Sequence, residues 1–109
     1  MEHIAIDLGG SESQICVRSA DGKIVEELCW DTRRLGAYLK KRPPGRVIVE
    51  TSSEAFRVAD TARELGHDVR VVPATLVPTL GVGAQGIKTD RRDARVLSEV
   101  SSQIGRAHV

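Results

Sequence analysis

The sequence has few of the features that most directly indicate a function. Only two of its 109 residues are cysteines, too few for a disulfide framework and at a spacing that matches no common zinc motif. We therefore expect Cys16 and Cys29 to be reduced packing thiols, with a single disulfide as the alternative. Aromatic residues make up 3% of the chain, so base stacking is not an expected way of binding nucleic acid. The net charge is +1, so nucleic acid or a membrane surface would have to bind through a local patch.

Long hydrophobic runs and targeting segments are also missing. No stretch of about 18 apolar residues occurs, so no transmembrane helix is expected. The N-terminus lacks the basic segment followed by an apolar segment that marks a secretory signal. The chain has 40% apolar and 28% charged residues, which is ordinary for a globular domain. We expect a cytoplasmic protein with one domain and a hydrophobic core.

Hydrophobic patterning predicts five strands and three helices. The strands are expected over residues 3–8, 14–19, 23–30, 46–50 and 68–72. The helices are expected within residues 31–42, 51–65 and 90–103, with a long loop over residues 73–88. The element order is βββαβαβα, in which an antiparallel meander precedes alternating helices and strands. This order predicts an α/β fold with a mixed five-stranded sheet.

Local signals define the ends of several elements. Asp21-Gly22 predicts a two-residue hairpin turn between the second and third strands. Thr51 and Glu54 have the spacing of a capping box at the start of the second helix. The strand over residues 46–50 is apolar without interruption, which indicates burial on both of its faces.

Two aspartates continue the apolar face of the last helix. That face is formed by Leu97, Val100 and Ile104, which are spaced by three and four residues. Asp90 and Asp93 extend the same face toward the N-terminus of the helix. A favourable interaction with the helix dipole would explain one aspartate in a first turn. It is a weaker explanation for two on the side that faces a sheet, where an unpaired charge is costly.

Two further acids stand at the ends of strands. Asp7 lies in "IAIDLGGS", and Glu50 ends "RVIVE". If these strands are neighbours, both side chains emerge near one edge of the sheet, and a helix packed across the sheet could bring Asp90 and Asp93 to the same point. Four carboxylates would repel one another, and Mg²⁺ or Mn²⁺ would relieve that repulsion. Two such ions about 3.5–4 Å apart form a clamp used in phosphodiester chemistry.

Four segments of the chain resemble one known family. "AIDLGG", "VIVET", "GHDVRVVPA" and "KTDRRDA" are similar to segments of the N-terminal domain of DEDD-type transposases of bacterial insertion sequences. These enzymes are ribonuclease-H-like, in the RuvC-like form, are related to the Piv invertase, and include the bridge-RNA-guided recombinases. The resemblance covers about residues 3–100, and "KTDRRDA" is its most specific part.

The resemblance implies the catalytic domain of a metal-dependent DNA transposase or recombinase. The family's catalytic and metal-binding acids correspond to Asp7, Glu50, Asp90 and Asp93. The implied cofactor is Mg²⁺ or Mn²⁺, and the implied partners are DNA, a guide RNA and further copies of the chain.

The resemblance also sets an expected domain organisation. Residues 1–104 correspond to the RuvC-like domain, and residues 105–109 are a tail. Relatives carry a further C-terminal domain with a serine nucleophile, which is absent here. The isolated chain is therefore expected to be inactive in complete recombination.

Basic residues cluster in two places and are candidates for binding nucleic acid. One group surrounds the first helix and consists of Arg33, Arg34, Lys40, Lys41 and Arg42. The other flanks the acidic pair and consists of Lys88, Arg91, Arg92 and Arg95. A solvated face is the alternative explanation of the first group. The second group lies beside the proposed metal ions, where the phosphates of a substrate would lie.

Two other functions are compatible with parts of the sequence. "DLGGS" also resembles the phosphate loop of actin-like ATPases and sugar kinases. Those enzymes close two such domains around ATP, and that interpretation leaves "KTDRRDA" without a role. The third possibility is a non-catalytic nucleic-acid-binding or assembly module, for which a large exposed apolar patch would be expected.

Overall fold

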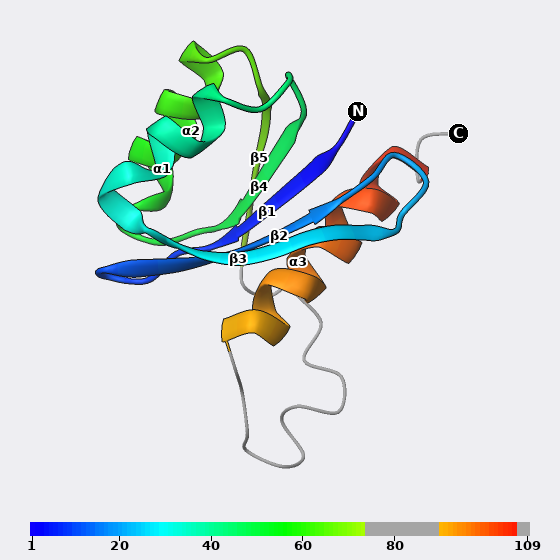
Figure 1. Cartoon of the computed structure of the whole chain (residues 1–109), viewed down its shortest axis with the longest axis horizontal. Coiled ribbons are helices and arrows are strands. Elements are labelled where there is room, and N and C mark those ends of the chain that lie inside the picture. The colour runs from blue at the N-terminus through cyan, green and yellow to red at the C-terminus, as the bar shows by residue number, and fades with distance from the viewer. Residues whose placement is uncertain (74–89, 107–109) are drawn as a thin grey trace.

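A five-stranded sheet forms the centre of the structure, with helices on both of its faces (Figure 1). The computed structural model describes the backbone of residues 1–73 and 90–106 and the side chains of residues 1–73 and 94–103. The strands are β1 (His3–Asp7), β2 (Glu12–Arg18), β3 (Ile24–Asp31), β4 (Arg46–Glu50) and β5 (Asp68–Val72). The helices are the 3-10 helix η1 (Thr32–Arg34) and the α-helices α1 (Leu35–Lys40), α2 (Ala55–Glu64) and α3 (Asp90–Arg106). The predicted order βββαβαβα is confirmed.

The sheet is mixed, as predicted, and its strand order is β3-β2-β1-β4-β5. β2 pairs antiparallel with β1 and β3, and β4 pairs parallel with β1 and β5. β1 and β4 are central, and burial on both faces explains why their sequences are apolar without alternation. The carboxyl ends of β1 and β4 therefore lie side by side at one edge of the sheet.

Two hydrophobic cores lie on opposite faces of the sheet. The larger core lies between the sheet and α1 and α2, and it includes Ile4 and Ile6 of β1. The smaller core lies between the sheet and α3, where Leu97 packs with Ala5 and Ile48. Because successive side chains of a strand point to opposite faces, β1 contributes to both cores. No helix in the described part of the chain is long and apolar enough to span a bilayer.

Two local predictions were wrong. The connection between β2 and β3 covers residues 19–23 and is closed by a 2.8 Å hydrogen bond from Ser19 N to Lys23 O, so it is longer than a two-residue turn. Gly22 adopts a φ of 93° within it, a conformation that glycine accepts without strain. The capping box at Thr51 does not form, because the Thr51 hydroxyl donates to Val72 O at 3.2 Å. Helix α2 instead begins at Ala55, without a side-chain cap.

Two serines anchor α3 to the sheet. The buried face of α3 contains Ala94, Leu97, Ser98 and Ser101. Ser98 Oγ accepts a 2.8 Å hydrogen bond from Arg18 Nε, and Ser101 Oγ lies 2.7 Å from His3 Nδ1. Apolar spacing located Leu97 but missed both serines, because a serine indicates neither a core nor a surface position. Polar anchors of this kind hold the direction of α3 across the sheet.

The partly buried position of His3 predicts a pH-dependent stability. Burial, followed by the charge of Arg46, lowers the pKa of His3 below its ordinary value of 6.5. The unfolded chain then binds more protons than the folded chain as the pH falls below 6.5, so stability is full above that pH and is lost on acidification. The melting temperature of the parent should fall more between about pH 7.5 and pH 5.5 than that of a His3→Gln variant. Parallel curves for the two proteins would contradict this prediction.

Candidate metal and phosphodiester site

Asp7 and Glu50 end two neighbouring parallel strands. β1 and β4 pair in register up to Ile6 and Val49, and the next residue of each strand is Asp7 and Glu50, respectively. Both residues are half-buried. The structure therefore brings these two predicted site residues to the same edge of the sheet.

The two carboxylates also belong to the same face of the sheet. Ala5 and Ile48 pack against α3, and Asp7 and Glu50 stand two residues further along their strands. Side chains two residues apart in a strand share a face. Asp7 and Glu50 thus lie on the face that α3 covers.

Helix α3 runs antiparallel to β1 and reaches the same edge. Ser101 contacts His3 at the start of β1, and Leu97 packs against Ala5. Leu97 lies four residues before Ser101 on the helix, and Ala5 lies two residues after His3 on the strand. Each of these steps advances the chain by about 6–7 Å. A further step of the same size leads to Asp93 on α3 and to Asp7 on β1, with Asp90 about one turn beyond. In Figure 1, the last turns of α3 lie near the N-terminal end of β1 and its first turn lies at the other end of the sheet.

The side chains of Asp90 and Asp93 lie outside the part of the structure whose side chains are described. Among the described side chains alone, no three acidic, histidine or cysteine groups are close enough to bind a metal ion. The available donors nevertheless have the right chemistry, because Mg²⁺ prefers carboxylate oxygen and water. Asp7 and Glu50 therefore fit the chemistry of a magnesium site.

A closed ring of hydrogen bonds holds the loop that follows Asp7. Gly9 N donates to Ser13 Oγ at 3.3 Å, Ser13 Oγ lies 2.7 Å from Thr32 Oγ1, and Thr32 Oγ1 donates to Gly9 O at 2.8 Å. A carbonyl oxygen can only accept, so the Thr32 proton points to Gly9 and the Ser13 proton to Thr32. Ser13 is fully buried and Thr32 nearly so. These two hydroxyls, which no pattern in the sequence indicated, position the loop next to Asp7.

The two glycines of this loop differ in their requirements. A Cβ atom on Gly9 would lie 2.1 Å from Glu12 O, a distance that the fold cannot accommodate. A Cβ atom on Gly10 would meet no atom within 4 Å. Gly9 is thus required by the close approach of the protein's own backbone. The exposed Gly10 leaves room for another molecule to approach the loop.

One arginine predicted to contact phosphates is engaged within the protein. Arg95 Nε and Nη2 donate to the two carboxylate oxygens of Glu27 on β3, at 2.6 Å and 2.8 Å. These hydrogen bonds raise the pKa of the Arg95 guanidinium. The pair connects residues 68 positions apart and attaches α3 to the edge strand. A phosphate could bind Arg95 only in competition with Glu27. The other three members of this basic group, Lys88, Arg91 and Arg92, have side chains outside the described residues.

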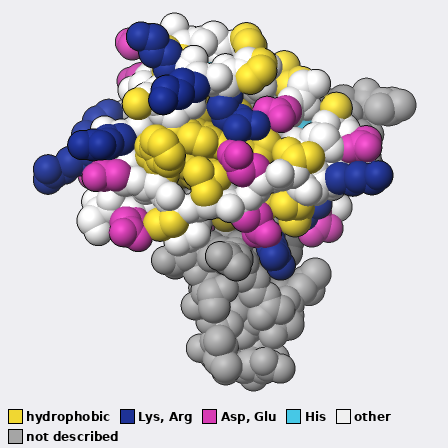
Figure 2. Space-filling view, in the orientation of Figure 1, with side chains coloured by type: hydrophobic (Ala, Val, Ile, Leu, Met, Phe, Trp, Pro, Cys, Tyr) yellow, Lys and Arg dark blue, Asp and Glu magenta, His cyan; other side chains and the backbone are white. Residues whose placement is uncertain are grey.

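Arg42 of the first basic group is also engaged. Its guanidinium contacts Glu2 at 2.8 Å and Glu26 at 3.1 Å, and it lies over the ring of Tyr38. The Tyr38 hydroxyl donates to Glu26, and burial, followed by this hydrogen bond, raises the pKa of Tyr38. Arg42 therefore joins α1 to the sheet. The exposed members of the group are Arg33, Arg34, Lys40 and Lys41. Figure 2 shows acidic side chains among the basic ones on this face, so the positive charge is not continuous.

Comparisons with known proteins add the identity of the fold. No family model and no curated protein matches the sequence. The structure is similar to that of RuvC from Thermus thermophilus, with a TM-score of 0.64, 15% sequence identity and coverage of 95% of each chain. A second similar structure is that of a Ppx/GppA phosphatase from Aquifex aeolicus, with 15% identity over 68% of this chain and 36% of the phosphatase. Its TM-score of 0.42 is too low to support a conclusion. The sheet topology and the similarity to RuvC show that the chain has a ribonuclease-H-like, RuvC-like α/β fold.

Proposed function

We propose that the chain is the metal-dependent catalytic domain of a DNA transposase or recombinase that acts on phosphodiester bonds. The observation that carries the proposal is the convergence of Asp7 and Glu50 on one edge and one face of the sheet, toward which the first turn of α3 runs. The proposed catalytic and metal-binding residues are Asp7, Glu50, Asp90 and Asp93. The RuvC-like fold supports a nuclease-type function of this kind.

Rigid positioning is the contribution of the chain's own residues. Two carboxylates extend from central strands that are buried on both faces, and two more belong to the first turn of a helix anchored by Ser98 and Ser101. Sites built on such elements are held more firmly than sites on loops. Bound Mg²⁺ ions would activate the nucleophile and stabilise the leaving oxygen. The ring of Gly9, Ser13 and Thr32 holds the adjacent loop, along which a strand of DNA could lie.

The proposal includes a division of labour between domains. We propose that the RuvC-like domain extends through the end of α3 at Arg106, beyond the expected boundary at residue 104, and that the serine nucleophile of strand exchange belongs to a further domain. We expect no strand exchange by the isolated chain. DNA, a guide RNA and further copies of the chain are the proposed partners of the complete assembly.

The metal site predicts a stabilisation by divalent cations. At about ten times its Kd, a bound ion adds about 1.4 kcal/mol to the free energy of unfolding by mass action. This should raise the melting temperature by several degrees in Mg²⁺ or Mn²⁺. Asp7→Asn with Asp93→Asn should remove the response. The same double variant should melt higher than the parent in EDTA, because it relieves the repulsion between carboxylates.

A matched variant separates the proposed site from general charge effects. Asp60→Asn with Glu99→Gln also removes two negative charges, from exposed positions on α2 and α3. This control should keep the full response to Mg²⁺, measured by differential scanning fluorimetry over a range of metal concentrations. An equal response in the Asp7 and Asp93 double variant would show that the metal binds elsewhere.

The phosphate loop of an ATPase or sugar kinase is the less favoured explanation of "DLGGS". The close approach of the Glu12 carbonyl oxygen already explains why residue 9 is a glycine, so no nucleotide phosphate is needed to explain it. The side-chain ring around Gly9 also uses its N–H group, which a phosphate loop would direct at the nucleotide.

A further inference from the structure

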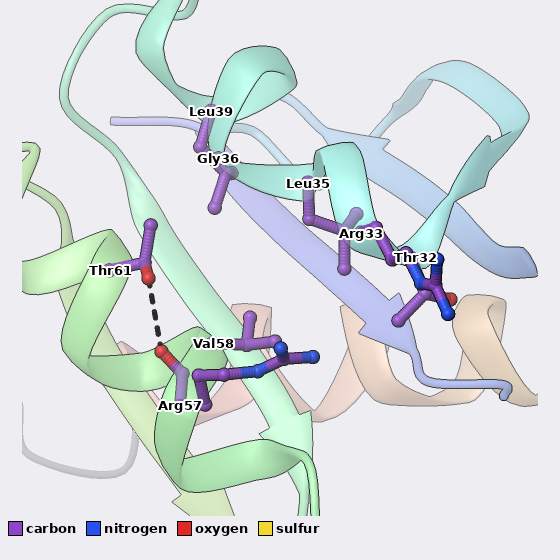
Figure 3. A pocket seen from close by; sticks show the side chains of 8 residues that line it. All are labelled: Thr32, Arg33, Leu35, Gly36, Leu39, Arg57, Val58 and Thr61. Atoms are coloured by element: carbon purple, nitrogen blue, oxygen red, sulfur yellow. Dashed lines mark hydrogen bonds between the residues drawn. The ribbon is translucent and has the colours of Figure 1, made fainter. Parts of the chain in front are cut away.

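A pocket lies between η1 and α1 on one side and α2 on the other. Its volume is about 160 Å³. Leu35, Leu39 and Val58 are buried side chains that form its apolar floor. Arg33 and Arg57 are exposed and stand at its margins. Figure 3 shows both arginine side chains extending toward the same side of the pocket.

The lining of the pocket suits an anion. Among the described residues, its lining contains two guanidinium groups and no carboxylate. The hydroxyls of Thr32 and Thr61 already donate to Gly9 O and Arg57 O, at 2.8 Å and 3.1 Å, so they have no proton left to offer an acceptor. The guanidinium groups would therefore supply the binding, and a guanidinium matches the geometry of a phosphate group.

Glu54 pairs with one of the two arginines, Arg57. Its Oε2 lies 2.6 Å from Arg57 Nη2, and the two side chains are 44% and 64% exposed, respectively. An exposed pair of this kind contributes little free energy. Arg57 also keeps further N–H groups that the pair does not use. Glu54 would thus weaken the binding of an anion but would not block it.

A hydrogen bond connects the lining of the pocket to the loop beside the candidate metal site. Thr32, which lines the pocket, donates to the carbonyl of Gly9, two residues after Asp7. Helix α2 supplies the opposite wall and begins five residues after Glu50. The pocket lies on the α1 and α2 side of the sheet, and the carboxylates lie on the α3 side. A nucleic-acid strand that crosses the edge of the sheet beside this loop would meet both.

We propose that this pocket is a phosphodiester-binding subsite for the strand on which the metal site acts, with Arg33 and Arg57 as its ligands. The inference rests on the proposed function and adds a second site at which the protein would contact the DNA strand. Arg57 was not among the basic residues that the sequence indicated, because it belongs to neither cluster. The subsite would hold a backbone phosphate of the same strand.

The test measures binding of a short single-stranded DNA in EDTA, so that the metal site contributes nothing. Fluorescence anisotropy at several salt concentrations gives the affinity and its salt dependence. Arg33→Gln with Arg57→Gln should weaken binding about tenfold and reduce the slope of log affinity against log salt by about 0.7, the value for one phosphate of a single strand. Lys23→Gln with Arg63→Gln is the matched control, because it removes two exposed positive charges that lie outside the pocket and outside both basic groups.

Amide chemical shifts locate the binding. The DNA should shift the amide signals of Gly36 and Thr61, which line the pocket. Inorganic phosphate should shift the same signals only at much higher concentration, since it lacks the rest of the strand. Equal effects of the two double variants, unchanged amide signals, or phosphate binding as tight as that of DNA would each overturn the subsite. The response to Mg²⁺ tests the metal site independently, so the subsite can fail while the proposed function stands.

Discussion

Replacing His67 with alanine is expected to lower the free energy of unfolding by roughly 2–5 kcal/mol. His67 is 5% exposed and forms two hydrogen bonds to the backbone. Gly45 N–H donates to Nδ1 at 3.0 Å, and Nε2 lies 2.9 Å from Leu39 O. A backbone N–H only donates and a carbonyl only accepts, so the imidazole is the neutral tautomer with its proton on Nε2. Alanine would leave both backbone groups buried without a partner.

The position of His67 makes this loss large. The side chain connects the residue that precedes β4 to the last turn of α1, and His67 itself lies three residues after the end of α2. Three elements of the larger core therefore depend on one imidazole. Urea denaturation followed by circular dichroism measures the effect. His67→Asn should recover part of the stability, because an amide can both accept and donate, and His3→Ala should cost less because His3 is only half-buried. A loss below about 1 kcal/mol for His67→Ala would contradict the account.

Gly9→Ala should destabilise the protein by about 1–3 kcal/mol and also weaken its response to divalent cations. The added Cβ atom would lie 2.1 Å from Glu12 O, so the backbone of the loop has to move. That movement breaks the ring of hydrogen bonds through Ser13 and Thr32. Because Gly9 stands two residues after Asp7, the displacement also changes the position of a proposed metal ligand.

A matched glycine and a matched threonine variant test this account. Gly10→Ala adds the same methyl group where no atom lies within 4 Å, and it should leave the melting temperature and the Mg²⁺ response near those of the parent. Thr32→Val keeps the shape of the side chain but removes its hydroxyl, so it should reproduce part of the Gly9→Ala effect. If Gly9→Ala and Gly10→Ala had the same melting temperature, the loop would accommodate the added methyl group without loss of stability. The proposed role of the loop in positioning Asp7 would then be wrong.

Local patterns in the sequence were sufficient for the order of the elements and for several of their bounds. Residues 46–50 and 68–72 are strands as expected, because short apolar runs between turn signals have few other solutions. The same patterns placed Asp7 and Glu50 at the ends of strands. Burial on both faces of the central strands follows from the same runs. These features depend on neighbours in the chain, which the sequence displays directly.

Capping was less predictable, although it is also local. Thr51 has the spacing of a capping box, but Val72 O is available to its hydroxyl because β5 pairs beside β4. A tertiary partner thus competes with the local one. A hydroxyl makes whichever hydrogen bond the final packing offers, and spacing alone does not reveal that choice.

Only the tertiary structure determined which charged and polar side chains have ion-pair or hydrogen-bond partners within the protein. Arg95 and Arg42 resemble the other basic residues in sequence, yet both form ion pairs with glutamates of β3, Glu27 and Glu26, respectively. Ser98 and Ser101 carry no apolar signal, yet they anchor α3. The pocket beside Arg57 exists because α1 and α2 pack against the same face of the sheet. Hydrophobic periodicity reports the side of an element that is buried, whereas ion pairs, hydrogen bonds and pockets arise between elements that meet only after folding.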